Sequence, residues 1–342
     1  MKRTLSSLAV ASLSALLAAC GADNTGAGVI TPGLQDTGNP AVDAGTDGSG
    51  DSDEDAGPTE DVTGDDTSAT PEAGLFTRSV QHDDLERTYL LYVPASFDAS
   101  GSAPLMLNFH GFSGTAQGQL AYADMRPLAD AEGFLLAYPQ GSLLDTGETH
   151  WNPVLEQEDN KSDADDFGFT EKMLDAIAAD YPFDAARVYA TGYSNGADFS
   201  YGLACYLSDR VAAIAPVSGS MSTPMLGDCA ANHPTSVLIF NGTADFVRPY
   251  EGYPGYLLSV DEATAFWAEH NASTAEPVTD GPDVGALTVE RERYLDGDGG
   301  AEVTLYRVVN GGHEWFDMDE DGADMNALVW GFVSRFDREG AR

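Results

Sequence analysis

Short apolar runs alternate with amphipathic stretches along the chain from Arg87 onward. The runs are rich in Val, Leu, Ile and aromatic residues and end at Gly, Pro or Asn, which predicts buried strands. The stretches between them repeat apolar residues at helical spacing, which predicts helices. Strands are predicted at 87–94, 104–111, 134–141, 187–193, 211–219, 236–242, 286–295 and 303–309, and helices at 125–132, 166–181, 196–209, 259–271 and 326–336. This alternation is typical of an α/β domain with a mostly parallel central sheet and helices on both faces.

The first twenty residues have a different pattern. Lys2 and Arg3 precede an apolar stretch that ends at Cys20, as in a signal peptide, and the stretch is shorter than a membrane span. Residues 17–20, Leu-Ala-Ala-Cys, resemble the lipobox of a bacterial lipoprotein, which implies cleavage before Cys20 and lipidation of its thiol. The alternative is an ordinary secretory signal. Either way the sequence predicts an extracytoplasmic protein, secreted or held at the cell envelope. If Cys20 is lipidated, the N-terminal lipid anchor is the only predicted contact with membrane.

Residues 21–73 lack the apolar content of a folded domain. They hold 13 Asp or Glu residues, no Lys or Arg, and few large apolar side chains. Such a segment cannot bury enough surface to offset its ordering entropy. The sequence therefore predicts a disordered acidic linker over 21–73 and one folded domain over 74–342.

Charge and cysteine content narrow the class of protein further. The chain has 16 Lys and Arg residues against 56 Asp and Glu, a formal net charge of −40. This charge argues against nucleic acid or anionic lipid as a partner of the domain. Setting Cys20 aside leaves Cys205 and Cys229, which in an oxidising compartment predict one disulfide, with two buried free thiols as the alternative.

A candidate nucleophile lies in the segment VYATGYSNGADFS. Ser194 stands between Gly192 and Gly196 in the pattern G-x-S-x-G, after a predicted strand and before a predicted helix. Glycines at these places permit a sharp strand-to-helix turn that exposes the central side chain. The pattern alone is weak, because an ordinary Gly-Ser turn looks the same, but its strand and helix context favours a nucleophilic serine.

A serine hydroxyl needs a base, and the chain has only six histidines. His313 follows the last predicted strand in a glycine-flanked loop, which suits a catalytic base. His110 ends another strand and is interpreted as a support for the turn that forms an oxyanion hole. The remaining histidines have no matching context and are interpreted as structural or surface residues: His82, His150, His233 and His270.

The orienting acid is predicted at Asp245, just after the strand SVLIFNG. Ser194, Asp245 and His313 then follow the chain order Ser, Asp, His of α/β-hydrolases. Asp317 and Asp319 are the alternative acids.

An oxyanion hole needs two backbone N–H groups. One is predicted at Asn195, the residue after the nucleophile. The other is predicted at Phe112 or Gly111, in the segment NFHGFSGT.

Four segments together, NFHGFSGT, GYSNGA, NGTADFVRPYEG and GGHEW, resemble the esterase family that includes polyhydroxybutyrate depolymerases and feruloyl or acetylxylan esterases, carbohydrate esterase family 1. The resemblance runs from about Ser79 to Phe336. It implies an α/β-hydrolase fold and serine-dependent hydrolysis of feruloyl or acetyl esters of polysaccharide, or of hydroxyalkanoate polyesters, without metal or cofactor. Family members often have proline where this chain has Phe316, so the resemblance does not extend to the rim of the site at this position.

Other interpretations stay open. A serine peptidase on the same fold and a non-catalytic surface binding protein are the competing functions. Trp151, Tyr193 and Trp315 are predicted to contact substrate, with core packing as the alternative for each. The acidic run at 317–322 resembles the first half of a calcium loop, but its twelfth position is Leu328, where a bidentate glutamate is needed, so no calcium site is predicted.

Overall fold

A computed structural model describes residues 72–155, 160–273 and 276–342. The predicted signal peptide, the lipidation of Cys20 and nearly all of the predicted linker lie outside the described residues.

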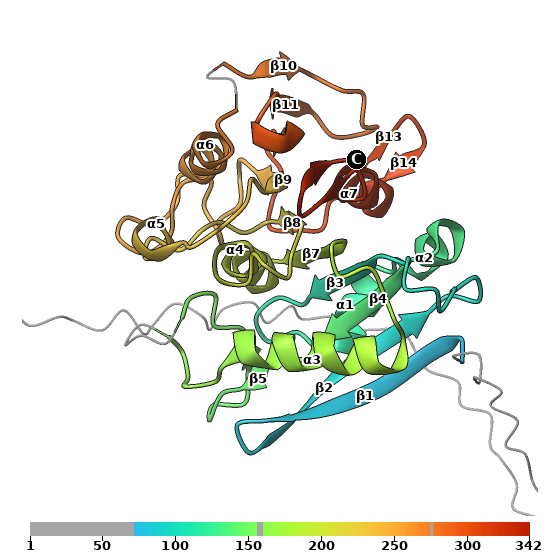
Figure 1. The fold of residues 1–342 in the computed structure, drawn as a ribbon. Helices are drawn as coiled ribbons and strands as arrows, with labels where there is room; N and C mark the ends of the chain where they lie inside the picture. Colours follow the sequence, from blue (N-terminus) through green and yellow to red (C-terminus); the bar gives the residue numbers. More distant parts are fainter. Residues whose placement is uncertain (1–71, 156–159, 274–275) are drawn as a thin grey trace, which may run out of the picture. The chain divides into compact units, whose positions relative to one another are not determined.

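A mixed ten-stranded sheet forms the centre of the domain (Figure 1). Its six middle strands, in the order β4, β3, β7, β8, β9 and β12, pair in parallel, whereas β1, β2, β10 and β11 at the two edges pair antiparallel. In sheet order the strands are β1 (Gly74–His82), β2 (Leu85–Val93), β4 (Leu135–Pro139), β3 (Leu105–Phe109), β7 (Val188–Tyr193), β8 (Ala213–Val217), β9 (Ser236–Gly242), β12 (Val303–Val308), β11 (Val289–Tyr294) and β10 (Val278–Asp280).

Helices cover both faces of this sheet. The helices are α1 (Ala116–Tyr122), α2 (Arg126–Glu132), α3 (Asp166–Asp180), α4 (Asn195–Tyr206), α5 (Met225–Asp228), α6 (Val260–His270) and α7 (Met325–Val333). Residues of α3, α4 and α6 share one hydrophobic core, and residues of α1, α2 and α7 share the other. None of the helices among the described residues has both the length and the hydropathy that a membrane span requires.

The period-two alternation of the strands explains the two cores. In β3, Leu105, Leu107 and Phe109 belong to the core under α3, α4 and α6. Met106, between them, belongs to the core under α1, α2 and α7. Because successive strand side chains point to opposite faces, a continuous apolar run fills both layers at once. The predicted α/β-hydrolase architecture, a mostly parallel sheet between helical layers, is confirmed.

The edges of the sheet depart from the sequence-based expectation. No strand was predicted at β1, although it pairs along its whole length with β2 and lies against α3 (Figure 1). Arg78 and His82 occupy positions of its half-buried face, so the hydrophobic alternation that marks a strand is interrupted. Helix α1 also escaped prediction, because it is short and contains Gly118. Its start depends on Thr115, whose hydroxyl accepts a hydrogen bond from the Gly118 N–H at 2.9 Å.

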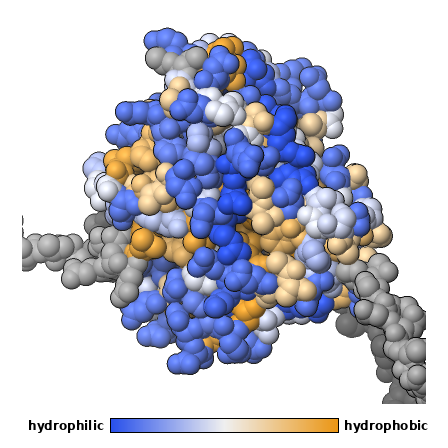
Figure 2. Space-filling view, viewed as in Figure 1, coloured by the Kyte–Doolittle hydropathy of each residue, from blue (hydrophilic) through white to orange (hydrophobic). Residues whose placement is uncertain are grey.

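Small hairpins supplement the central sheet. They pair β5 (Ser142–Leu143) with β6 (Thr149–His150), β13 (Asp319–Glu320) with β14 (Ala323–Asp324), and β15 (Phe336–Asp337) with β16 (Gly340–Ala341), and one 3₁₀ turn spans Asp298–Gly300. On the face shown in Figure 2, hydrophilic residues cover most of the surface and smaller apolar patches interrupt them. This fits the acidic composition.

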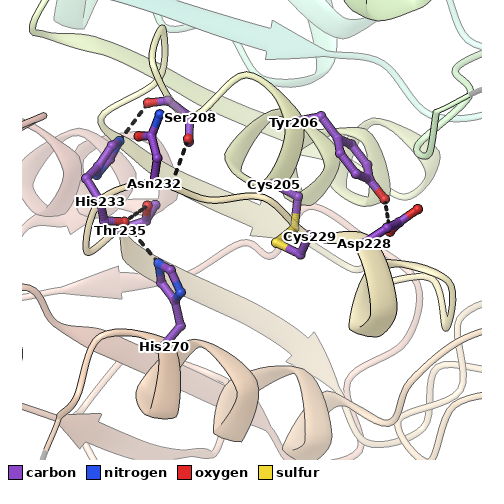
Figure 3. Close-up of a disulfide and its surroundings, with 9 residues drawn as sticks. All are labelled: Cys205, Tyr206, Ser208, Asp228, Cys229, Asn232, His233, Thr235 and His270. Atoms are coloured by element: carbon purple, nitrogen blue, oxygen red, sulfur yellow. Dashed lines mark hydrogen bonds between the residues drawn. A yellow bond between two sulfur atoms is a disulfide. The ribbon is translucent and has the colours of Figure 1, made fainter.

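The predicted disulfide is present between Cys205, near the end of α4, and Cys229, directly after α5 (Figure 3). The cystine closes a sequence separation of 24 residues. Beside it, the Tyr206 hydroxyl donates a hydrogen bond to Asp228 at 2.6 Å. The bridge therefore fastens the helix that follows the nucleophile to the segment that leads into β9.

Removing the cystine is expected to destabilise the domain without altering its fold. By the chain-entropy estimate a loop of this length contributes roughly 3–4 kcal/mol. The double variant Cys205→Ala/Cys229→Ala should therefore unfold at a clearly lower urea concentration than the oxidised wild type. Equilibrium urea denaturation measures this, and the wild type under a reducing agent is the control. Equal midpoints for all three samples would contradict the prediction.

Candidate active site

Ser194 stands at the turn between β7 and α4. Its backbone has φ of 55° and ψ of −117°, a conformation that residues with a side chain rarely adopt. The Ser194 N–H donates to the Val217 carbonyl of the neighbouring strand at 2.9 Å. The turn therefore directs the serine side chain out at the carboxyl ends of the parallel strands, where α/β folds hold their ligands.

Two glycines make this turn sterically feasible. A Cβ on Gly196 would lie 2.3 Å from the Phe109 carbonyl oxygen, and one on Gly192 would lie 2.5 Å from the Gly196 oxygen. Real Cβ atoms do not come this close to backbone atoms, so the first turn of α4 approaches the end of β3 only because both positions lack side chains.

The loops that follow β9 and β12 bring an acid and a base together. These strands are parallel neighbours, so the loops at their carboxyl ends lie side by side. The Ala244 N–H donates to the Gly311 carbonyl at 2.9 Å, and the Asn310 N–H donates to the Thr243 hydroxyl at 2.8 Å. Each loop thus fixes the other in place.

Asp245, His313 and Ser194 form one chain of hydrogen bonds. His313 Nδ1 lies 2.7 Å from Asp245 Oδ2, and His313 Nε2 lies 2.8 Å from Ser194 Oγ. An ionised carboxylate only accepts hydrogen bonds, so Nδ1 carries the ring proton and Nε2 is free to accept the serine proton. The other Asp245 oxygen, Oδ1, accepts from the backbone N–H groups of Val247 and Arg248, both at 2.8 Å.

The structure thus joins the three predicted residues in one chain of hydrogen bonds. The two alternative acids lie elsewhere. Asp319 Oδ1 accepts from the Gly322 N–H at 2.8 Å in the turn between β13 and β14. Asp317 is exposed. The carboxylate beside His313 is that of Asp245, whose side chain is fully buried.

The loop after β3 lies against the serine. A Cβ on Gly111 would be 3.3 Å from Ser194 Cβ. The Gly111 carbonyl accepts from the Gly114 N–H at 2.9 Å and from His110 Nδ1 at 2.8 Å. In a trans peptide the N–H points opposite to the carbonyl, so these two bonds fix the direction of the Phe112 N–H. Of the two residues predicted for this donor, the geometry favours Phe112 over Gly111.

The second predicted donor is Asn195, the first residue of α4. Within the described parts of the chain, the backbone N–H groups of Asn195 and Phe112 have no hydrogen-bond acceptor. An N–H in the first turn of a helix has no partner within the helix, so it is available to an anion. Both groups are thus free to bind a negatively charged oxygen beside Ser194.

His110 is held in one neutral tautomer. Its Nδ1 donates to the Gly111 carbonyl, and its Nε2 accepts from the Gly141 N–H at 2.9 Å. Burial lowers the pKa of His110 to about 4, because the buried ring cannot be solvated as a cation. Its contacts agree with the predicted role as a support of the turn at Gly111.

The predicted substrate contact of Trp151 is wrong. Its ring is fully buried, stacks on Phe199 and donates through Nε1 to the His110 carbonyl at 3.0 Å. Its backbone N–H and carbonyl pair with the side-chain amide of Asn195 at 2.8 and 3.0 Å. Trp151 therefore packs the core beneath the site, and it escaped correct interpretation because a tryptophan in a long polar loop resembles a surface aromatic.

Tyr193 and Trp315 lie beside the base. The Tyr193 hydroxyl donates to the His313 carbonyl at 2.8 Å, and the two rings are 5.0 Å apart. The backbone N–H of Trp315 donates to the hydroxyl of Tyr122. The Tyr122 ring contacts the ring of Tyr193. Sequence reasoning missed Tyr122, because its helix carries no clear periodic signal. These contacts position the His313 loop and leave substrate binding by Tyr193 and Trp315 a prediction.

The remaining histidines hold loops together. His150 contacts the Ser142 carbonyl at 3.1 Å, and His233 contacts the Ser208 carbonyl at 2.7 Å. His270 in turn contacts the His233 carbonyl at 3.0 Å (Figure 3). These contacts agree with their interpretation as structural residues.

Two clusters of acidic residues contain side chains of the types that bind metal ions. His82, Asp83 and Asp165 offer ligand atoms within 4.8 Å of one another, but both carboxylates are half or more exposed. In the acidic run at 317–322, Glu320 accepts from Arg291 at 2.6 Å, and Asp319 accepts from the Gly322 N–H at 2.8 Å. Structural contacts thus account for Glu320 and Asp319, and within the described ranges neither cluster contacts Ser194.

Comparison with known proteins identifies the central part of the chain. Residues 87–245 match the family model described as Esterase PHB depolymerase. This segment is an Esterase PHB depolymerase domain. It contains Ser194 and ends at Asp245, and His313 lies beyond it.

Individual relatives extend the likeness. Feruloyl esterase B of Piromyces equi is 28% identical over 262 residues, which are 73% of this chain and 45% of that protein. The bifunctional acetylxylan esterase/xylanase XynS20E of Neocallimastix patriciarum is 25% identical over 250 residues, 73% of this chain and 34% of that protein. The chain thus spans less than half the length of either enzyme. Among solved structures, an acetyl xylan esterase from Aspergillus awamori superimposes with a TM-score of 0.55 at 16% identity, over 75% of this chain and 99% of that chain. This likeness confirms the α/β-hydrolase fold.

An alanine substitution at Gly196, two residues after the nucleophile, can be compared with one at a glycine in an open position. Gly196→Ala places a methyl group against the Phe109 carbonyl and is expected to cost about 1–3 kcal/mol and to distort the turn at Ser194. Gly331→Ala in α7 meets nothing within 4 Å and should leave stability unchanged or raise it by about 0.5–1 kcal/mol. Urea denaturation of both variants measures the difference. Equal tolerance of the two alanines would contradict the steric argument.

The buried neutral His110 makes stability dependent on pH. Below pH 6.5 the unfolded chain protonates this imidazole, whereas the folded protein does so only near pH 4. The free energy of unfolding should therefore fall by roughly 3 kcal/mol through this group as pH drops from 6.5 to 4. His110→Asn should show a shallower decline than the wild type when urea midpoints are measured across this range. Parallel pH profiles would contradict the assignment.

Proposed function

We propose that the protein is a serine carboxylic-ester hydrolase in which Ser194, His313 and Asp245 are the catalytic triad. The observation that carries the proposal is the continuous chain of hydrogen bonds, with His313 2.7 Å from Asp245 and 2.8 Å from Ser194. A base within hydrogen-bond reach of a hydroxyl, oriented by a buried acid, is the arrangement that makes serine nucleophilic. The named esterases among its relatives support the same reaction class.

In the acylation step, Ser194 Oγ attacks the ester carbonyl carbon while His313 Nε2 accepts the hydroxyl proton. The carbonyl oxygen becomes an oxyanion, and the N–H groups of Phe112 and Asn195 stabilise it. Loss of one such donor typically costs about 3–4 kcal/mol. When the tetrahedral intermediate collapses, the bond to the alcohol oxygen breaks, and His313 returns the proton to the departing alcohol.

Deacylation repeats the chemistry with water. His313 accepts a proton from a water molecule, whose oxygen attacks the acyl carbon bound to Ser194. The second tetrahedral intermediate releases the carboxylic acid, and the proton passes from His313 to Ser194 Oγ. Asp245 keeps the imidazole in its reactive tautomer throughout and stabilises the imidazolium that forms in each step.

One exposed aromatic side chain lies in the oxyanion turn itself, and another directly follows the acid. Phe112 is 42% exposed and Phe246 is 83% exposed. Tyr122, 48% exposed, contacts Tyr193 next to the nucleophile. Solvent-exposed aromatics next to reactive groups favour a substrate with an apolar or aromatic acyl group. We therefore place feruloyl esters first among the substrates, ahead of acetyl esters of polysaccharide and hydroxyalkanoate polyesters.

We further propose that the enzyme acts outside the cytoplasm, as a secreted or cell-envelope protein held by a lipid on Cys20. The disulfide between Cys205 and Cys229 is consistent with an oxidising compartment. The lipobox-like sequence at residues 17–20 supports the anchor. Neither nucleic acid nor a cofactor has a part in this proposal.

Replacing the nucleophile tests the reaction. Ser194→Ala should abolish hydrolysis of p-nitrophenyl acetate and methyl ferulate and leave the thermal unfolding curve unchanged, because only the hydroxyl is removed. The matched control is Ser200→Ala on the same helix, whose hydroxyl donates to the Gly196 carbonyl at 2.9 Å. Undiminished hydrolysis by Ser194→Ala would exclude this serine as the nucleophile.

The same assay separates the competing functions. Cleavage of amide but not ester probes by the wild type would favour the serine peptidase. Tight binding of a feruloylated oligosaccharide without turnover of any ester would favour the non-catalytic binding protein. Hydrolysis of methyl ferulate in preference to acetylated xylan and a hydroxybutyrate oligomer is the result that the exposed aromatics predict.

A further inference from the structure

A buried ion pair joins the loop that carries the acid to the helix that carries the nucleophile. Nε and Nη2 of Arg248 lie 3.1 and 2.9 Å from Oδ2 of Asp198. The two side chains are only 17% and 5% exposed. Arg248 lies three residues after Asp245, and Asp198 lies four residues after Ser194. The pair therefore spans the distance between two members of the proposed triad.

Arg248 touches the acid through its own backbone. Its N–H donates to Asp245 Oδ1 at 2.8 Å, while the Val247 N–H donates to the same oxygen. Movement of Arg248 thus moves a donor that holds the Asp245 carboxylate. The Asp198 carboxylate raises the pKa of the Arg248 guanidinium, so the guanidinium stays charged.

Asp198 is fixed on its other side as well. Its Oδ1 accepts from the Ser220 N–H at 3.0 Å, and its backbone N–H donates to the Ser194 carbonyl at 3.0 Å. The turn between these groups is closely packed, because a Cβ on Gly219 would lie 2.8 Å from both Asp198 Oδ1 and the Ser194 oxygen. The same segment reaches the base, since the Ser218 hydroxyl donates to the Glu314 carbonyl at 2.7 Å.

We propose that Arg248 and Asp198 are positioning residues for the triad, and that their ion pair sets where the Asp245 carboxylate stands relative to Ser194. Loss of Asp198 leaves the Arg248 cation buried without a partner, so the acid loop that carries it shifts toward water. Loss of Arg248 releases the acid loop from α4 and leaves the Asp198 carboxylate buried without its cation. Among the described residues the two side chains contact neither Ser194 Oγ nor the His313 ring, so the pair acts through Asp245 and the first turn of α4. This inference rests on the proposed ester hydrolysis.

The proposal predicts a loss of turnover that leaves substrate affinity unchanged. Displacement of a catalytic group by about 1 Å can cost on the order of 100-fold in rate. Arg248→Ala should lower kcat for p-nitrophenyl acetate by about 100-fold and leave KM within about twofold, since ester binding does not use the pair. Ethylguanidinium in the assay should restore part of kcat by occupying the vacated site, and Arg248→Lys should be intermediate because it lacks the planar fork.

Three further variants complete the test. Asp198→Asn should lower kcat in the same way, and the double variant should be no worse than Arg248→Ala, because both remove one interaction. The structural control is Arg187→Ala, which breaks a contact with Asp184 at 2.8 Å before the amino end of β7, at the far end of the strand from Ser194. Its kcat should equal that of the wild type, and thermal unfolding of every variant separates misfolding from mispositioning.

The outcomes separate a failure of the positioning role from a failure of the proposed ester hydrolysis. A kcat of Arg248→Ala within twofold of the wild type, additive losses in the double variant, or a loss that ethylguanidinium does not reverse in a folded protein would overturn the positioning role while leaving ester hydrolysis intact. An inactive wild type, or an active Ser194→Ala, would instead overturn the proposed function and this inference with it.

Discussion

The close approach of α4 to the end of β3 is the constraint on which the site depends. Gly196 lets the first turn of the helix touch the Phe109 carbonyl, where any side chain would collide. This contact permits the turn in which Ser194 has a positive φ. The Asn195 N–H, in the first turn of the same helix, has no acceptor among the described residues. It also places the loop after β3 against the serine. One steric condition therefore fixes the nucleophile and both candidate oxyanion donors together.

The parallel order of β7, β8, β9 and β12 supplies the rest of the geometry. Loops at the carboxyl ends of adjacent parallel strands must be neighbours, so Asp245 after β9 and His313 after β12 lie on the same edge as Ser194 after β7. Backbone contacts between these loops, and the ion pair between Asp198 and Arg248, reduce their freedom. The hydrogen bonds of the triad are thus the consequence of several independent restraints, as preorganised catalysis requires.

The site residues that were predicted correctly from local sequence share one property. Each lies next to glycines or to a strand end that marks a turn. Ser194 lies between glycines, His313 follows a pair of glycines, and Asp245 follows a strand that ends in Asn-Gly. Such signals need no knowledge of distant contacts. The same holds for the apolar runs of the central strands, because parallel strands are buried on both faces and read as continuous apolar segments.

The features that the sequence did not predict correctly are those that depend on tertiary contacts. Strand β1 carries polar residues on the face that α3 covers, and Trp151 became a core residue because α4 packs over a polar loop. Asp198 is one acid among 56 Asp and Glu residues, and its partner stands 50 positions away. Only the fold shows that these two side chains meet beside the triad, so no local pattern distinguishes Asp198 from a solvated surface charge.

The central claim is that the Ser194 hydroxyl is made reactive by His313. Reaction of the purified protein with a fluorophosphonate, followed by intact-mass and peptide mass spectrometry, tests it most directly. The account predicts one adduct per chain, located on Ser194, and a much slower reaction in His313→Ala. An adduct on another residue, or labelling of Ser194 at the same rate without the imidazole, would contradict it.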